Sequence, residues 1–182
     1  PPMGNFYTEL NSGNSLQYVG IAAGSGITPV LSIIKETLSA EKSSHFTLIY
    51  ANKNNGSVIF KNELNDLADK FKNRLKVLHI FSRENLEENQ YSGRPDKEKL
   101  SLILTAENLF IANHYFICGP EEMIMAANSL LQEKDIKKEN IHFELFTTPV
   151  KMAAEKPVVN SNFDGDAKVK VIIDGITTEF TL

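Results

Sequence analysis

The chain has 182 residues, of which 23% are charged and 42% are apolar, a composition typical of an ordinary globular domain. Its net charge of -4 argues against a nucleic-acid-binding protein, which usually carries a basic face. No apolar run approaches the roughly 18 residues of a membrane span, and the first residues lack the charged and apolar regions of a signal peptide. We therefore expect a cytoplasmic protein with neither nucleic acid nor a membrane as partner.

The single cysteine, Cys118, excludes an intrachain disulfide and also a self-contained four-cysteine zinc or iron–sulfur site. The four histidines are scattered without the spacing of metal ligands, and His79 and His142 fall within strand-like runs. We predict no metal site in this chain.

Five short apolar runs are typical of strands buried on both faces of a sheet, and they cover residues 16–23, 46–51, 75–81, 114–118 and 141–145. Helical spacing fills the intervals, over residues 29–38, 60–71, from 96 onward, and 120–131. This alternation predicts an α/β fold, a five-stranded parallel sheet with helices on both faces. Ligands of such sheets bind beyond the carboxyl ends of the strands, so the residues that follow each strand are the candidates for a site.

The pattern changes after residue 147. Residues 148–164 contain prolines and polar residues without a sustained period, which predicts a linker. Residues 165–182 alternate around Asp174-Gly175, which predicts a β-hairpin. Because a lone hairpin is only marginally stable in water, we expect it to pack against the main domain, a missing domain or another chain. The last of these would give a hairpin-mediated dimer.

The two ends of the chain favour a fragment of a longer protein over an ordinary processed N-terminus. The chain opens on Pro1-Pro2 rather than on Met, and it ends within the strand-like run at Leu182.

A glycine-rich loop, Gly24-Ser25-Gly26-Ile27-Thr28-Pro29, joins the first strand to the first helix. Glycines let backbone N–H groups approach a phosphate, and a helix N-terminus adds partial positive charge. The loop lacks the third glycine of the dinucleotide fingerprint and the lysine of a P-loop. It is a candidate diphosphate cradle, and a tight turn without a ligand is the alternative.

The fourth strand ends at Cys118, and Gly119 and Pro120 open the next helix. Cys118 is a candidate nucleophile, but no histidine base is evident near it and no feature lowers its pKa. A small buried residue that lines a cofactor pocket is the favoured interpretation.

Residues at the ends of the second and third strands should bind the adenosine end of a dinucleotide and so discriminate between NAD and NADP. An acid there binds the ribose of NAD, and a base suits the 2′-phosphate of NADP. The second strand runs into Asn52 and Lys53 without an acid, and Ser82 and Arg83 follow the third strand. These residues favour NADP over NAD, with a solvated loop charge as the alternative for Arg83.

Taken together, these motifs resemble the nucleotide-binding half of the ferredoxin–NADP reductase family. The matching segments are the glycine-rich loop, Ser82-Arg83, Tyr91-Ser92-Gly93-Arg94-Pro95, Cys118-Gly119-Pro120-Glu121-Glu122-Met123, and residues 142–146. The opening residues resemble the last turn of the family's flavin domain, and the hairpin resembles the start of a ferredoxin domain. This order is similar to reductase components of multicomponent oxygenases, in particular those of the phenylacetyl-CoA type.

The resemblance implies a division of the chain and a route for electrons. Residues 1–10 would end a flavin domain, residues 11–147 would bind NAD(P)H, and residues 165–182 would begin a ferredoxin domain. Electrons would pass from NAD(P)H through FAD and a 2Fe–2S cluster to an oxygenase component. The chain by itself would bind nucleotide without turnover, because it lacks the flavin barrel and the cluster cysteines. The alternative is a stand-alone interaction domain that acts by β-strand addition of its hairpin.

The resemblance also assigns roles to residues. Thr28 and Cys118 would line the nicotinamide pocket and Glu144 would lie near the flavin, which makes these three the catalytic candidates. The cofactor-binding candidates are Gly24, Ser25, Gly26, Ile27, Thr28, Pro29, Asn52, Lys53, Ser82, Arg83, Cys118, Gly119, Pro120, Glu121 and Met123.

Overall fold

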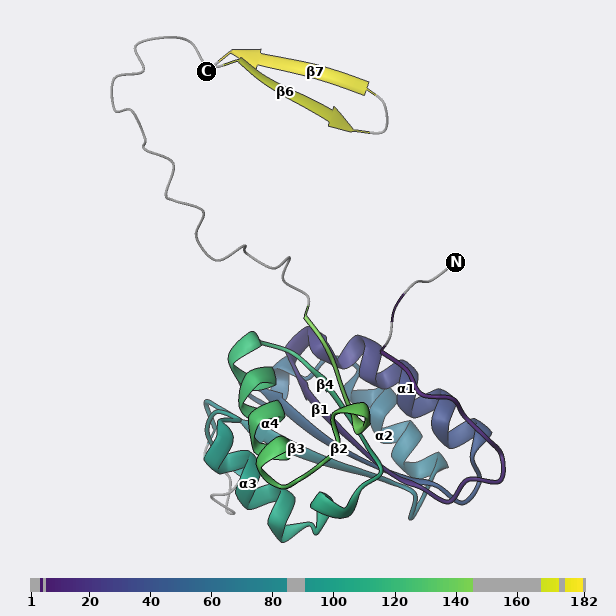
Figure 1. Cartoon of the computed structure of the whole chain (residues 1–182). Coiled ribbons are helices and arrows are strands. Elements are labelled where there is room, and N and C mark those ends of the chain that lie inside the picture. Colours follow the sequence, from purple (N-terminus) through teal and green to yellow (C-terminus); the bar gives the residue numbers. More distant parts are fainter. Residues whose placement is uncertain (1–3, 5, 85–90, 146–167, 174–175, 182) are drawn as a thin grey trace. The chain divides into compact units, whose positions relative to one another are not determined.

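The computed structural model describes residue 4 and residues 6–84, 91–145, 168–173 and 176–181 (Figure 1). The chain divides into two compact units, Pro1–Thr148 and Pro149–Leu182.

The first unit is built on a parallel sheet whose strands are β1 (Gln17–Ala23), β2 (His45–Asn52), β3 (Leu75–Phe81), β4 (His114–Cys118) and β5 (Ile141–Glu144). Their order is β3-β2-β1-β4-β5, and each neighbouring pair is parallel. The predicted five-stranded parallel sheet is confirmed. The chain leaves β1 for β2 on one side and later returns to β4 on the other, so the switch point of the sheet lies between β1 and β4.

Helices cover both faces of this sheet, as the alternation predicts: α1 (Ile27–Ala40), α2 (Lys61–Lys70), α3 (Lys97–Ala106) and α4 (Glu121–Glu133). Figure 1 shows α1 and α2 on one side and α3 and α4 on the other. Ile34, Leu38 and Leu64 belong to the apolar core of the first face. Leu100 and Ile124 belong to the core of the second face.

Short 3-10 turns connect several of these elements: η1 (Gly24–Gly26), η2 (Asn55–Ser57), η4 (Leu109–Ile111) and η5 (Lys138–Asn140). The first of them changes a predicted boundary, because α1 begins at Ile27 rather than at Pro29. Proline is tolerated within the first helical turn, where its missing N–H has no intrahelical partner. At the predicted start of α3, Asp96 caps the helix by accepting a hydrogen bond from the Lys99 N–H at 2.9 Å.

The second unit contains two antiparallel strands, β6 (Lys168–Ile173) and β7 (Ile176–Thr181). They form the hairpin that the alternation predicts. Its turn residues, 174–175, and the predicted linker 148–164 lie outside the described residues.

Candidate functional site

A cavity of about 720 Å³ opens at the carboxyl edge of the sheet, beside the switch point. It is lined by residues that follow β1, β2, β3 and β4 and by the first turn of α4. Ligands of open parallel sheets bind at this place. Of the residues predicted from sequence, the cavity brings together Gly24, Ser25, Asn52, Lys53, Ser82, Gly119, Pro120 and Met123.

The glycine-rich loop packs directly against the end of β4. A Cβ atom on Gly26 would lie 2.1 Å from the carbonyl oxygen of Cys118 and 2.8 Å from the backbone nitrogen of Gly119. These are backbone atoms, so no side-chain movement could make room for a larger residue. Gly24 and Ser25 of this loop and Gly119 after β4 all line the cavity.

Asn52 lines the cavity at the end of β2. Its Nδ2 atom is buried. Burial raises the pKa of the neighbouring Tyr50, and a hydrogen bond with the Asn52 side chain partly offsets this effect. Lys53 lines the same wall and is exposed, which adds a positive charge beside the amide.

The wall formed at the starts of α3 and α4 contains residues that sequence reasoning did not single out. The cavity is also lined by Ala23, Ala51, Ser57, Arg94, Pro95, Asp96, Glu122 and Ala126. The most informative of these is Arg94, an exposed cation just before α3. Its signal was present in the sequence, because it lies within the 91–95 segment that carries the family resemblance.

Other predicted residues lie outside the cavity lining: Gly26, Ile27, Thr28, Pro29, Arg83, Cys118, Glu121 and Glu144. The exposed Thr28 donates its hydroxyl to the Ser25 carbonyl oxygen at 3.0 Å, so it stabilises the loop. Arg83 is exposed just beyond Ser82. Glu144 is the last residue of the edge strand β5, where it is exposed and in register with Cys118.

The Cys118 side chain is fully buried. Burial and, to a smaller extent, the negative charge of Glu144 raise the pKa of its thiol to about 11. Because the thiolate is the reactive form of cysteine, this residue is not an activated nucleophile at neutral pH. Gly119 and Pro120, the two residues after it, line the cavity in its place.

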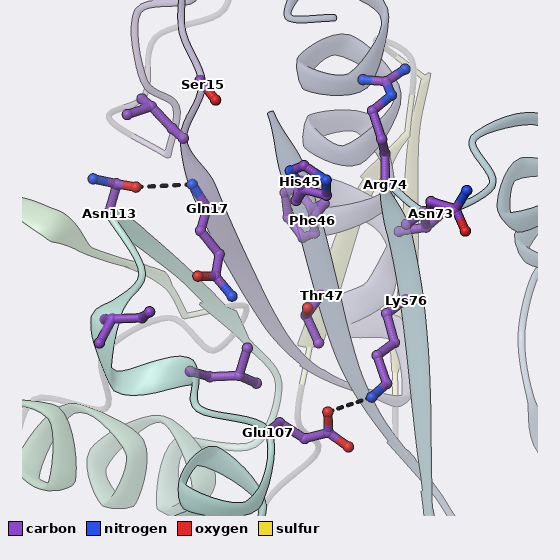
Figure 2. A pocket seen from close by; sticks show the side chains of 14 residues that line it. Ser15, Gln17, His45, Phe46, Thr47, Asn73, Arg74, Lys76, Glu107 and Asn113 are labelled. Carbon is purple, nitrogen blue, oxygen red and sulfur yellow. Dashed lines mark hydrogen bonds and ion pairs between the residues drawn. The ribbon is translucent and has the colours of Figure 1, made fainter. Parts of the chain in front are cut away.

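A second cavity, of about 810 Å³, lies at the opposite, amino-terminal edge of the sheet (Figure 2). It is lined by the first residues of β1, β2 and β3 and by the segment around η4. Figure 2 shows an ion pair between Lys76 of β3 and Glu107 at this cavity. No glycine-rich loop and no N-terminus of the helices α1–α4 contributes to its lining, so it lacks the features of a phosphate site.

One family model matches most of the first unit. A family model described as the oxidoreductase NAD-binding domain matches residues 21–129. This range begins at Ile21, near the end of β1, and extends through most of α4.

Two relatives match nearly the whole chain. It is 42% identical over its full length to one of the subunits of the 1,2-phenylacetyl-CoA epoxidase of Escherichia coli, and it covers 50% of that subunit. It is 36% identical over 97% of its length to the ferredoxin reductase component of the 3-ketosteroid-9-alpha-monooxygenase of Mycobacterium tuberculosis, of which it covers 46%. The chain thus spans about half the length of the curated relatives it matches.

Solved structures show the same fold. The CS-b5R domains of human Ncb5or, in an NAD+ form, superpose with a TM-score of 0.61 at 29% identity, over 70% of this chain and 36% of that chain. The cytochrome P450 reductase GcoB of Amycolatopsis superposes with a TM-score of 0.68 at 18% identity, over 81% of this chain and 43% of that chain. Within the part of the chain that the structure describes, no helix is both long and apolar enough to cross a bilayer.

Proposed function

Because the chain belongs to the oxidoreductase NAD-binding domain family, we propose that it is the NADPH-binding part of a longer reductase that delivers electrons to an oxygenase component. The observation that carries this proposal is the cavity at the switch point, which is lined by the glycine-rich loop, by the ends of β2 and β4 and by the start of α4. A dinucleotide is elongated, polar and anionic, and this cavity offers it donors and cations along several strand ends.

The lining residues divide into three regions along the edge of the sheet. Gly24 and Ser25 would hold the diphosphate, because they lie in the 3-10 turn that leads into α1. Asn52, Lys53, Ser82 and Arg94 would hold the adenosine end, and Gly119, Pro120 and Met123 would hold the nicotinamide end. When bound, the dinucleotide supplies a hydride. The residues of this chain orient it and exclude water from one of its sides.

We favour NADP over NAD on the residues at the end of β2 and on the position of two cations, although the lining also contains Asp96 and Glu122. No acid follows Asn52 at the end of β2, where NAD-binding sites place a carboxylate for the ribose. Lys53 and Arg94 line the cavity, whereas Arg83 does not. We therefore assign the 2′-phosphate to Lys53 and Arg94, with Ser82, in place of the predicted Ser82–Arg83 pair.

The remaining parts of the route are proposals for the longer protein. FAD and a 2Fe–2S cluster would be held by parts of the longer protein outside this chain. The single cysteine, Cys118, cannot supply the four cysteine ligands of the cluster. The names of the two relatives support an oxygenase component as electron acceptor, of the phenylacetyl-CoA type. The names of these relatives do not favour the interaction-domain alternative. The hairpin-mediated dimer and the cytoplasmic location remain predictions.

Calorimetric titration with 2′-phospho-AMP and, separately, with 5′-AMP tests this assignment. Both probes carry the adenosine end and need no flavin domain. We expect the 2′-phosphate compound to bind at least ~10-fold tighter, a difference of ~1.4 kcal/mol. Arg94→Gln should remove most of this preference, and Arg83→Gln should leave it nearly intact.

The matched control is Lys72→Gln, which removes a positive charge at an exposed residue outside the cavity. Equal affinity for the two probes would identify NAD as the cofactor. Binding of neither probe would contradict the nucleotide site itself and favour the interaction-domain alternative.

A further inference from the structure

A hydrogen bond ties the segment before α3 to the end of the same helix. The Tyr91 hydroxyl donates to Oε1 of Glu107 at 3.1 Å, and Glu107 is the first residue after α3. The other carboxylate oxygen, Oε2, pairs with Lys76 of β3, as Figure 2 shows. Two different elements therefore hold this carboxylate, whose side chain is only 18% exposed.

The same segment leads directly to the cavity. Ser92 forms a parallel bridge with Phe81, the last residue of β3, and the Gly93 N–H donates to the Phe81 carbonyl oxygen at 2.9 Å. Gly93 has a φ of 107°, a conformation that favours glycine, and it turns the chain just before Arg94. On the far side, the Asp96 N–H donates to the Arg94 carbonyl oxygen at 2.9 Å. Backbone hydrogen bonds thus form on both sides of Arg94, and the start of the segment depends in addition on Tyr91.

Tyr91 adds a side-chain anchor at the start of this segment. Its ring is partly buried and packs against the apolar core beneath α3 and α4, and its hydroxyl donates a hydrogen bond to Glu107. Glu107 itself is absent from the lining of the nucleotide cavity. It lies instead at the second cavity, on the amino-terminal edge of the sheet.

We propose that Glu107 is a positioning residue for nucleotide selection, which acts through Tyr91 to hold the 91–94 segment so that Arg94 meets the 2′-phosphate. The inference rests on the proposed function. It adds that selection of the 2′-phosphate depends on a hydrogen bond outside the cavity, between Tyr91 and Glu107. Loss of the Tyr91–Glu107 hydrogen bond would free Arg94 to sample other positions. It would leave the glycine-rich loop and Asn52 unchanged, so the affinity for 5′-AMP should change little.

The test measures the ratio of the affinities for 2′-phospho-AMP and 5′-AMP in variants of the 182-residue chain. Tyr91→Phe and Glu107→Leu should each lower this ratio about fivefold, the loss expected for one hydrogen bond of roughly 1 kcal/mol. Glu107→Gln keeps an oxygen that accepts from the Tyr91 hydroxyl, so it should restore most of the ratio. Tyr7→Phe is the matched control, because it removes the hydroxyl of an exposed tyrosine outside the cavity.

A purely structural role would lower the melting temperature of the variants without changing the ratio, and that result would overturn the inference. Tyr91→Phe keeps the test decisive if Glu107→Leu does not fold. If the wild-type chain selects the 2′-phosphate and Tyr91→Phe keeps the wild-type ratio, only the positioning role fails. If the wild-type chain binds neither probe, the proposed function fails, and the positioning role fails with it.

Discussion

A methyl group on Gly26 would force the glycine-rich loop away from the end of β4. The carbonyl oxygen and carbonyl carbon of Cys118 lie 2.1 Å and 2.5 Å from the position of a Cβ atom on Gly26. Since both belong to the backbone of β4, relief requires the glycine-rich loop to move away from the strand. The absence of a side chain at Gly26 therefore allows the glycine-rich loop to pack against the end of β4.

We expect Gly26→Ala to destabilise the fold by about 1–3 kcal/mol, the usual range for an overpacked site, and to weaken 5′-AMP binding. Urea unfolding followed by circular dichroism measures the first effect, and calorimetry measures the second. Gly56→Ala is the matched control, because a Cβ atom there lies 3.5 Å from its nearest neighbour, the side-chain oxygen of Asn54. Equal stability of the two variants would show that the close approach at Gly26 is not a constraint.

At the scale of elements, the strands and helices of the first unit follow from apolar periodicity. The strand ends then place Asn52 and Gly119 in one cavity, because the carboxyl ends of parallel strands share an edge of the sheet. Arg94 could not be placed in this way. Many residues separate the end of β3 from α3, and apolar periodicity does not reveal which cation of that connection returns to the cavity.

The burial of Glu41 could not be predicted from the sequence either. Its carboxylate accepts hydrogen bonds from the Asn11 N–H at 3.1 Å, from the Tyr18 hydroxyl at 2.9 Å and from the Ser44 hydroxyl at 2.7 Å. Burial opposes its ionisation, but hydrogen bonds, first that from Ser44, outweigh burial and lower its pKa. These partners come from three separate segments, so the pattern of residues around Glu41 gives no signal for its burial.

Two histidines join the neighbouring strands β4 and β5. The Nδ1 atom of His114 lies 3.2 Å from the Nε2 atom of His142, so one of the two rings must be neutral to accept the hydrogen bond. Burial lowers the pKa of both residues; the charge of His114 lowers that of His142 further, and the charge of Glu41 partly offsets the effect at His114. The folded protein therefore favours the neutral pair.

The stability that this pair contributes is fully present above the unfolded pKa of about 6.5. It is lost as the pH falls from there through the lower pKa values of the folded state. We expect the free energy of unfolding to be smaller at pH 5.5 than at pH 7.5, as measured with urea. The double variant His114→Gln/His142→Gln should reduce this difference, and the exposed His45→Gln should not. An undiminished pH dependence in the double variant would contradict this role.

At the scale of the whole molecule, the first unit presents cavities of similar volume at the two edges of one sheet. Size does not distinguish them, but their chemistry does. The carboxyl-edge cavity has a glycine-rich loop and the start of α4, whereas the cations Lys76 and Arg74 of the other cavity are held by neighbouring oxygens. A dinucleotide should therefore select the carboxyl edge.

The most direct test of this claim is a titration of the isotopically labelled chain with 2′-phospho-AMP, followed by amide signals in heteronuclear NMR spectra. We predict that the largest shifts fall on residues 24–25, 52–53, 82, 94 and 96, which line the regions assigned to the phosphates and the adenosine end. The amino-edge residues Gln17, Thr47, Lys76 and Asn113 should remain unchanged. Shifts confined to these amino-edge residues, or an unchanged spectrum at saturating probe, would contradict the assignment of the nucleotide site.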